Sequence, residues 1–266
     1  MRLGFTVPEL LRAGRGGGAL RMGLRRVAEV DWLWPDFDRV ARAAAFDAHP
    51  EAVREQPGAA DAVHELAAFL GIDGGLAQIA RAHWEDICIL QSDEEGAPYQ
   101  LTAAAVAFPT DWRLDEKMGQ GLTAIHAPIH GYAEQLAAGV DHFFNILPPG
   151  DIFGRANWFI VADSAWRYLP EDDPATRFAH VTAANAGETL FVRCERQTLR
   201  RLPKTRAMIF TIGVALAPLG TLAPDLVRRL ADALPALPEG EQQRRHVVGY
   251  AAPLRAYADG LTRHAA

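Results

Sequence analysis

The chain has 266 residues, of which 49% are hydrophobic and 23% charged, so it can bury a core and fold as one large domain or two small ones. Its net charge of −6 argues against nonspecific binding to nucleic acid or to anionic membranes. Two cysteines are too few for a disulfide framework or a complete iron–sulfur cluster. The N-terminus has no signal-peptide core, and no apolar run is long enough to span a bilayer. We therefore expect a cytoplasmic protein that binds neither nucleic acid nor membrane.

The first 21 residues are rich in Gly and Arg and show no hydrophobic periodicity, which predicts a loosely ordered arm. A phosphate-binding loop at Gly14–Gly18 is the alternative. It is poorly supported, because no strand precedes these glycines and no Gly-Lys-Ser/Thr follows them. We expect residues 22–266 to form a single domain with helical extensions.

The rest of the chain alternates between two hydrophobic periods. From Trp32 to Trp84, apolar residues recur every three or four positions and predict three helices, with Asp36 near the first N-cap and Gly71 ending the second. A period near two then predicts a hairpin of Asp86–Gln91 with Gln100–Phe108, and strands at Ala156–Ala162, Thr189–Arg193 and Ala207–Leu216. The helical period returns at Tyr132–Phe144, Pro224–Leu234 and Gly240–Tyr257, which predicts three further helices. Nearly consecutive strands with few intervening helices predict an α+β fold on an antiparallel sheet.

Several common chemistries lack their motifs. The chain has no GxSxG elbow, Walker A loop, strand–GxGxxG–helix unit or HExxH helix. Cys88 lies inside a predicted strand and Cys194 at the end of another, where a small buried thiol is the usual role. If the protein performs redox chemistry, its electrons must come from elsewhere.

Two histidines stand out between Trp112 and Tyr132. His126 and His130 have i, i+4 spacing, but Pro128 between them argues against a shared helical face and a chelating pair. His126 can instead offer one ring nitrogen to a cofactor iron while a backbone carbonyl orients the other. The simpler interpretation is a loop histidine satisfied by hydrogen bonds.

Two polar segments are further candidates. Strand alternation places Arg155 and Asn157 on one face, where they can hold a substrate or a propionate; an edge-strand arginine in solvent is the alternative. The segment 192–204 is dense in arginine and predicts an anion-binding or ion-pair network, with a solvated charged turn as the alternative.

Together these segments resemble the heme-dependent oxidative N-demethylases and their relatives, whose pattern is close to W…K.G..L..IH.PVP, then R.NW, then ERQTLRRLP and an apolar FTI strand. The matching residues are Trp112, Lys117, Gly119, Leu122, Ile125, His126 and Pro128; Arg155, Asn157 and Trp158; Glu195 to Pro203; and Phe210, Thr211 and Ile212. The segment Met22–Asp38 is also similar, so the resemblance covers about Met22 to Leu219.

The resemblance implies a PAS-like fold that binds heme b, with His126 as the iron ligand. The family usually has proline at the position of His130, so His130, His83 and His142 remain alternative ligands. It also implies that dioxygen oxidises the N-methyl group of a small secondary amine and releases formaldehyde. Electrons would come from NAD(P)H through a separate flavin and iron–sulfur reductase.

Site roles follow from the same resemblance. We expect Arg155, Asn157 and Arg201 to contact the cofactor, Arg196 to donate to bound oxygen or a propionate, and Glu195 to accept the substrate ammonium. The alternatives are a PAS-like heme sensor of gas or redox state and a heme-free binding protein of the same fold.

Overall fold

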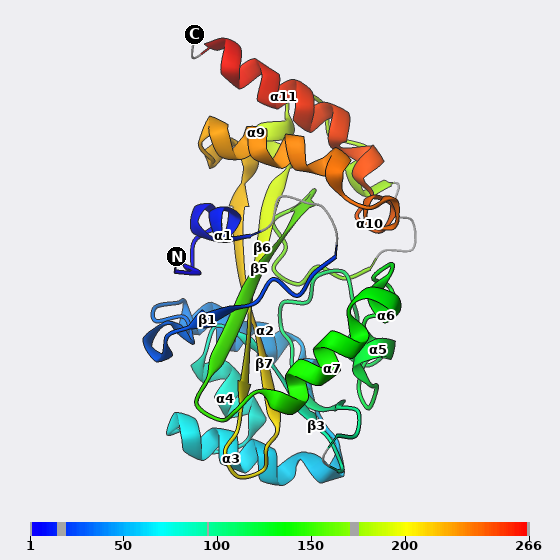
Figure 1. Cartoon of the computed structure of the whole chain (residues 1–266). Helices are drawn as coiled ribbons and strands as arrows, with labels where there is room; N and C mark the ends of the chain where they lie inside the picture. The colour runs from blue at the N-terminus through cyan, green and yellow to red at the C-terminus, as the bar shows by residue number, and fades with distance from the viewer. Residues whose placement is uncertain (1, 15–19, 95, 171–175, 265–266) are drawn as a thin grey trace.

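The fold is a mixed α and β structure around one antiparallel sheet (Figure 1). The computed structural model describes residues 2–14, 20–94, 96–170 and 176–264. Seven strands lie in the order β1-β5-β6-β7-β3-β4-β2, and every neighbouring pair is antiparallel. The strands are β1 (Arg25–Val27), β2 (Val53–Glu55), β3 (Asp86–Gln91), β4 (Gln100–Ala105), β5 (Ile152–Val161), β6 (Phe191–Arg201) and β7 (Met208–Pro218). The predicted α+β class with an antiparallel sheet is confirmed.

Helices lie on both faces and at both ends of the sheet (Figure 1). They are α1 (Val7–Ala13), α2 (Arg39–Ala48), α3 (Ala60–Leu70), α4 (Leu76–Ala82), α5 (Leu122–Ile125), α6 (Tyr132–Gln135), α7 (Ala137–Ile146), α8 (Ala186–Thr189), α9 (Pro224–Ala233), α10 (Glu239–Arg244) and α11 (Ala251–His264). In the described part of the chain, no helix combines the length and apolar character that crossing a membrane requires.

Two helix ends follow local chemistry. The Asp38 side chain, rather than Asp36, caps α2 by accepting a hydrogen bond of 2.9 Å from the Ala41 N–H. Gly71 ends α3 in the left-handed conformation at φ 66°, as the sequence predicts. The single helix expected at Tyr132–Phe144 is instead two, because the backbone leaves the helical conformation at Leu136.

The N-terminal segment differs from the loosely ordered arm that was expected. Thr6 and Glu9 form a capping box at the start of α1, and Val7, Leu10 and Leu11 are buried in the main core. The helix packs against β5 and β6. The short length of α1 hid its periodicity in the sequence. The segment Gly14–Gly18, considered above as a phosphate-binding loop, lies outside the described residues except for Gly14.

Two hydrophobic cores lie against the sheet. The larger one includes Leu10, Trp158, Cys194 and Ala215, which lie on the face that α1 and α9 cover. The smaller one, with Leu90, Leu101, Phe144 and Leu199, lies on the opposite face beneath α7. Alternation along β6 therefore sends successive side chains into different environments.

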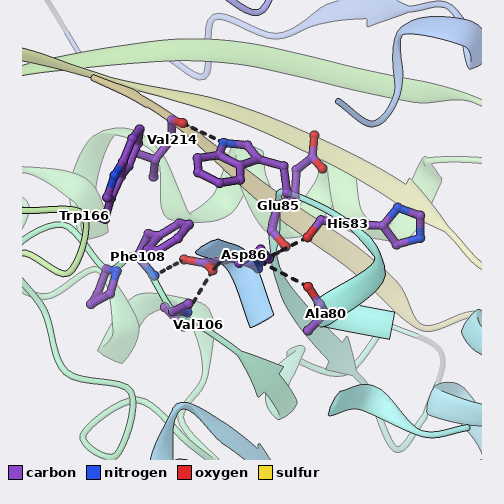
Figure 2. Close-up of polar contacts among 12 residues, drawn as sticks. Ala80, His83, Glu85, Asp86, Val106, Phe108, Trp166 and Val214 are labelled. Carbon is purple, nitrogen blue, oxygen red and sulfur yellow. Dashed lines mark hydrogen bonds and ion pairs between the residues drawn. The ribbon is translucent and has the colours of Figure 1, made fainter. Parts of the chain in front are cut away.

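A buried ion pair anchors α2 to the start of β3 (Figure 2). Arg42, which is fully buried, pairs with Asp86 at 2.9 Å and donates to the carbonyls of Ala80, His83 and Glu85. Asp86 also accepts the N–H groups of Ala107 and Phe108, so its charge is fully compensated. This network fixes the chain at the point where it leaves β4 for the loop around Thr110.

Candidate functional site

A cavity of about 580 Å³ opens on the sheet face that α5, α6 and α7 cover. This volume is within the range of small-molecule and cofactor sites. Its remaining walls come from residues 20–24, the loop 110–112 and helix α10. One region is apolar and continuous with the smaller core; it is lined by Cys88, Leu90, Leu101, Leu122, Leu136, Val140, Phe144, Leu199 and Phe210.

The floor of the cavity carries a polar relay across β5 and β6. Arg155 lies opposite Gln197, and Asn157 opposite Glu195, in the antiparallel register. The Arg155 Nε donates to Gln197 Oε1 at 2.7 Å, and the Gln197 amide donates to Glu195 Oε2 at 2.8 Å. All four residues line the cavity. The predicted common face of Arg155 and Asn157 is confirmed, and Glu195 joins it.

Helix α10 supplies a second polar wall. Arg244 makes two hydrogen bonds to the carboxylate of Glu241, at 2.9 and 2.8 Å, and Arg245 adds a third at 3.0 Å. Arg245 also donates to the Trp158 carbonyl at 2.8 Å, which ties α10 to β5. Its guanidinium lies 4.7 Å from the centroid of the Phe159 ring. These charged side chains are held by several contacts each.

His126 lies in the wall formed by the α5–α6 segment. Its Nδ1 is 2.8 Å from the carbonyl oxygen of Leu122, so this nitrogen carries the proton and donates. The ring stacks on Tyr132 with centroids 4.4 Å apart and planes 12° apart. Burial lowers the pKa of His126 to about 4, and the charges of Arg155 and Lys117 act in the same direction. The imidazole is therefore neutral at pH 7, with Nε2 unprotonated.

Tyr132 is the other half of this pair and lines the cavity. Its hydroxyl is buried and has no hydrogen-bond partner among the described residues. Burial raises its pKa to about 12, so the hydroxyl stays protonated and able to donate. A buried donor without a partner at a cavity wall suits a bound ligand.

The other candidate histidines are less well placed. His130 is exposed and lines the cavity. It packs so closely against Gly240 of α10 that a Cβ built on Gly240 would lie 2.5 Å from the Cβ of His130. His142 is exposed on α7 and does not line the cavity. His83 follows α4, beside the buried ion pair, also outside the cavity lining (Figure 2). His126 alone combines a cavity position with an oriented, neutral ring.

Arg196 and Arg201 do not line the cavity. Arg196 lies on the opposite face of the sheet, fully buried, and donates to the carbonyls of Gly4, Asp31 and Trp32. The structure does not bring it to the site because even-numbered residues of β6 face α1. The charged turn that was the alternative for this segment is wrong, since β6 runs through Arg201.

Arg201 shares the face of Glu195 but lies at the far end of β6. It donates to the carbonyls of Phe144 and Leu147 at the end of α7 and to the Tyr99 hydroxyl. Its side chain therefore satisfies backbone groups that the helix end leaves without partners. Arg193, farther along the same face, similarly binds the carbonyls of Phe108, Pro109 and Trp166.

Sequence reasoning missed the contributions of Tyr132, Gln197 and the α10 residues. The i, i+3 and i, i+4 spacing of Glu241, Arg244 and Arg245 predicts ion pairs on a helix. The neighbouring sequence does not predict that these residues lie over β5, because their position depends on the path of the chain between α9 and α11.

Within the described residues, no cluster of three or more His, Cys, Asp or Glu side chains can hold a bare metal ion. A cofactor iron that needs one axial histidine is compatible with this arrangement. A family model described as "Haem-dependent oxidative N-demethylase, alpha subunit-like" matches residues 73–252. The match includes the cavity floor, the His126 wall and α10.

Proposed function

Because the chain belongs to this family of heme-dependent oxidative N-demethylase alpha-subunit-like proteins, we propose that the cavity binds heme b and that the loaded protein oxidises an N-methyl group. His126 is the proposed axial ligand. The observation that carries the proposal is the hydrogen bond from its Nδ1 to the Leu122 carbonyl, which leaves a neutral Nε2 for iron.

The lining of the cavity suits heme in polarity and charge. Its apolar region suits a flat hydrophobic macrocycle, and its lining has five cationic and three acidic residues: Arg21, Lys117, Arg155, Arg244 and Arg245 against Asp111, Glu195 and Glu241. This excess of two positive charges matches the two carboxylates of heme. Arg155 and Lys117 act electrostatically on His126, so we assign the propionates to them.

The proposed reaction converts an N-methyl amine, dioxygen, two electrons and two protons into the demethylated amine, formaldehyde and water. Bound heme supplies the activation of dioxygen. Glu195, held by Gln197, accepts the substrate ammonium at the cavity floor, and Asn157 lies beside it. The apolar walls exclude water from the reacting methyl group.

The remaining features of the proposal extend beyond the chain itself. The two electrons come from a separate flavin and iron–sulfur reductase, and the protein works in the cytoplasm. The strand order β4-β3-β7-β6-β5, with α5, α6 and α7 between β4 and β5, supports a PAS-like core.

Formaldehyde release tests this function. The heme-loaded protein receives electrons from an added reductase under air, with dimethylamine as the probe. We expect formaldehyde and monomethylamine in equal amounts, and a raised KM in Glu195→Gln because the ammonium loses its counter-charge. The matched control is Glu188→Gln, whose carboxylate is exposed on α8. No formaldehyde from heme-loaded, reducible protein with this or any N-methyl amine would refute the reaction.

A further inference from the structure

Helix α10 carries more positive charge toward the cavity than its own contacts neutralise. Arg244 and Arg245 share a single carboxylate, that of Glu241, which is buried to 6% exposure. Arg244 Nη1 and Arg245 Nη2 make no hydrogen bond to any residue that the structure describes. Two adjacent guanidinium groups with free N–H donors and one shared counter-charge form a site for one further anion.

The two arginines are held in place before any ligand binds. Their side chains are 22% and 16% exposed, and both guanidinium groups lie over the Phe159 ring, at 5.8 and 4.7 Å from its centroid. Arg245 is also fixed to the Trp158 carbonyl. Because these planar donors are already fixed, they lose little entropy when they bind a carboxylate. Mobile arginines on the surface would lose more.

An acceptor for a cation lies close to this wall. Glu195 is on β6, directly opposite Asn157, and Asn157 precedes the two aromatic residues that the arginines cover. Burial alone would lower the pKa of Arg244, but the carboxylates of Glu241, Asp111 and Glu195 outweigh burial and raise it. The charge of Glu195 therefore acts on Arg244. The cavity therefore presents a positive wall and a negative floor at neighbouring positions.

We propose that Arg244 and Arg245 bind a carboxylate of the substrate while Glu195 binds its ammonium, so that the preferred substrate is an N-methyl amino acid rather than a simple dialkylamine. This inference rests on the proposed function. Two other cations remain for heme, because Arg155 on the cavity floor and Lys117 both act electrostatically on His126 and neither belongs to α10.

Calorimetric titration of the heme-loaded protein tests the proposal, with N-methylglycine and dimethylamine as probes. We expect N-methylglycine to bind at least about 10-fold more tightly, since charged hydrogen bonds of this kind contribute about a factor of 10 to 100. Arg244→Gln should lose this advantage and leave dimethylamine binding within about 3-fold. Arg244→Lys should recover part of the advantage. The matched control is Arg255→Gln, which removes a partly exposed ion pair with Asp232 outside the cavity.

Two results would overturn the inference. One is equal affinity of the wild-type protein for the two probes. The other is loss of heme content in Arg244→Gln, measured by the pyridine hemochrome spectrum, since it would assign the pair to the propionates. Failure of the proposed function is distinguishable: protein that takes up no heme is titrated with the same probes, and Arg244-dependent binding of N-methylglycine then supports the carboxylate site alone.

Discussion

Glu85 provides a test of the burial energetics that does not depend on any ligand. Its side chain, labelled in Figure 2, is completely buried. The backbone N–H of Trp34 donates to Oε1 at 2.8 Å, while Oε2 has no partner among the described residues. Burial raises its pKa from 4.5 to about 7. In the unfolded chain the carboxyl titrates near its ordinary value. Between pH 4.5 and about pH 7, the folded protein therefore holds a proton on Glu85 that the unfolded chain has lost.

The sign and size of the effect follow from this difference. Stability from the protonated carboxyl is fully present below pH 4.5 and is lost as the pH rises through 7. At 1.36 kcal/mol per pKa unit, the loss between pH 5 and pH 8 is about 2.5 kcal/mol. Glu85→Gln keeps an oxygen for the Trp34 N–H and carries no charge at any pH. The free energy of unfolding of the wild-type protein should thus fall by this amount relative to Glu85→Gln.

Urea unfolding of the heme-free protein at pH 5 and pH 8, followed by tryptophan fluorescence, measures the difference. His83 and His126, whose pKa values burial lowers to about 4, titrate in both proteins and cancel. Glu188→Gln, an exposed carboxylate, is the matched control and should follow the wild-type profile. Parallel pH profiles for the wild-type protein and Glu85→Gln would refute the argument.

Three further predictions concern the cavity and its supports. Because the pKa of the His126 ring is about 4 and iron binding further opposes its protonation, ligation of added ferric heme should persist as the pH falls below 6 in a spectrophotometric titration; loss of ligation with a midpoint near 6.5 would contradict the burial of the ring. Tyr132→Leu removes the stacking partner and should speed heme dissociation by up to about 10-fold, whereas Tyr132→Phe keeps the stack and should change it by less than about 3-fold; equal rates would exclude a positioning role. Arg201→Ala leaves the carbonyls of Phe144 and Leu147 without donors and should lower the free energy of unfolding by at least about 3 kcal/mol, with full heme binding in the folded fraction; unchanged stability with weaker heme binding would return Arg201 to the cofactor site.

The sequence predicted those features that depend on local periodicity. Alternation along β5 predicted the common face of Arg155 and Asn157, and the backbone carbonyl expected to orient His126 is that of Leu122. The resemblance to the heme-dependent oxidative N-demethylases is confirmed by the family match. The hydrogen bond from His126 to Leu122 is the arrangement that an iron-binding role would require.

Other features depend on contacts distant in the chain. Glu195 and Arg196 were expected to act together, but adjacent residues of a strand point to opposite faces. The sequence predicts a strand only as far as Arg193, whereas β6 continues to Arg201, and this continuation places the two side chains on opposite faces. The carbonyls that receive Arg196 come from the N-terminal region, which has no periodicity to predict its position.

The central claim is that His126 ligates heme iron in this cavity. The most direct measurement is the ultraviolet–visible spectrum of protein expressed with a heme precursor, oxidised, dithionite-reduced, and reduced with carbon monoxide. We predict a stoichiometric Soret band that shifts with carbon monoxide in the wild-type protein and in His142→Ala, the exposed-histidine control, and the loss of this spectrum in folded His126→Ala. Absence of a band from folded wild-type protein, or an identical spectrum in His126→Ala, would contradict the claim.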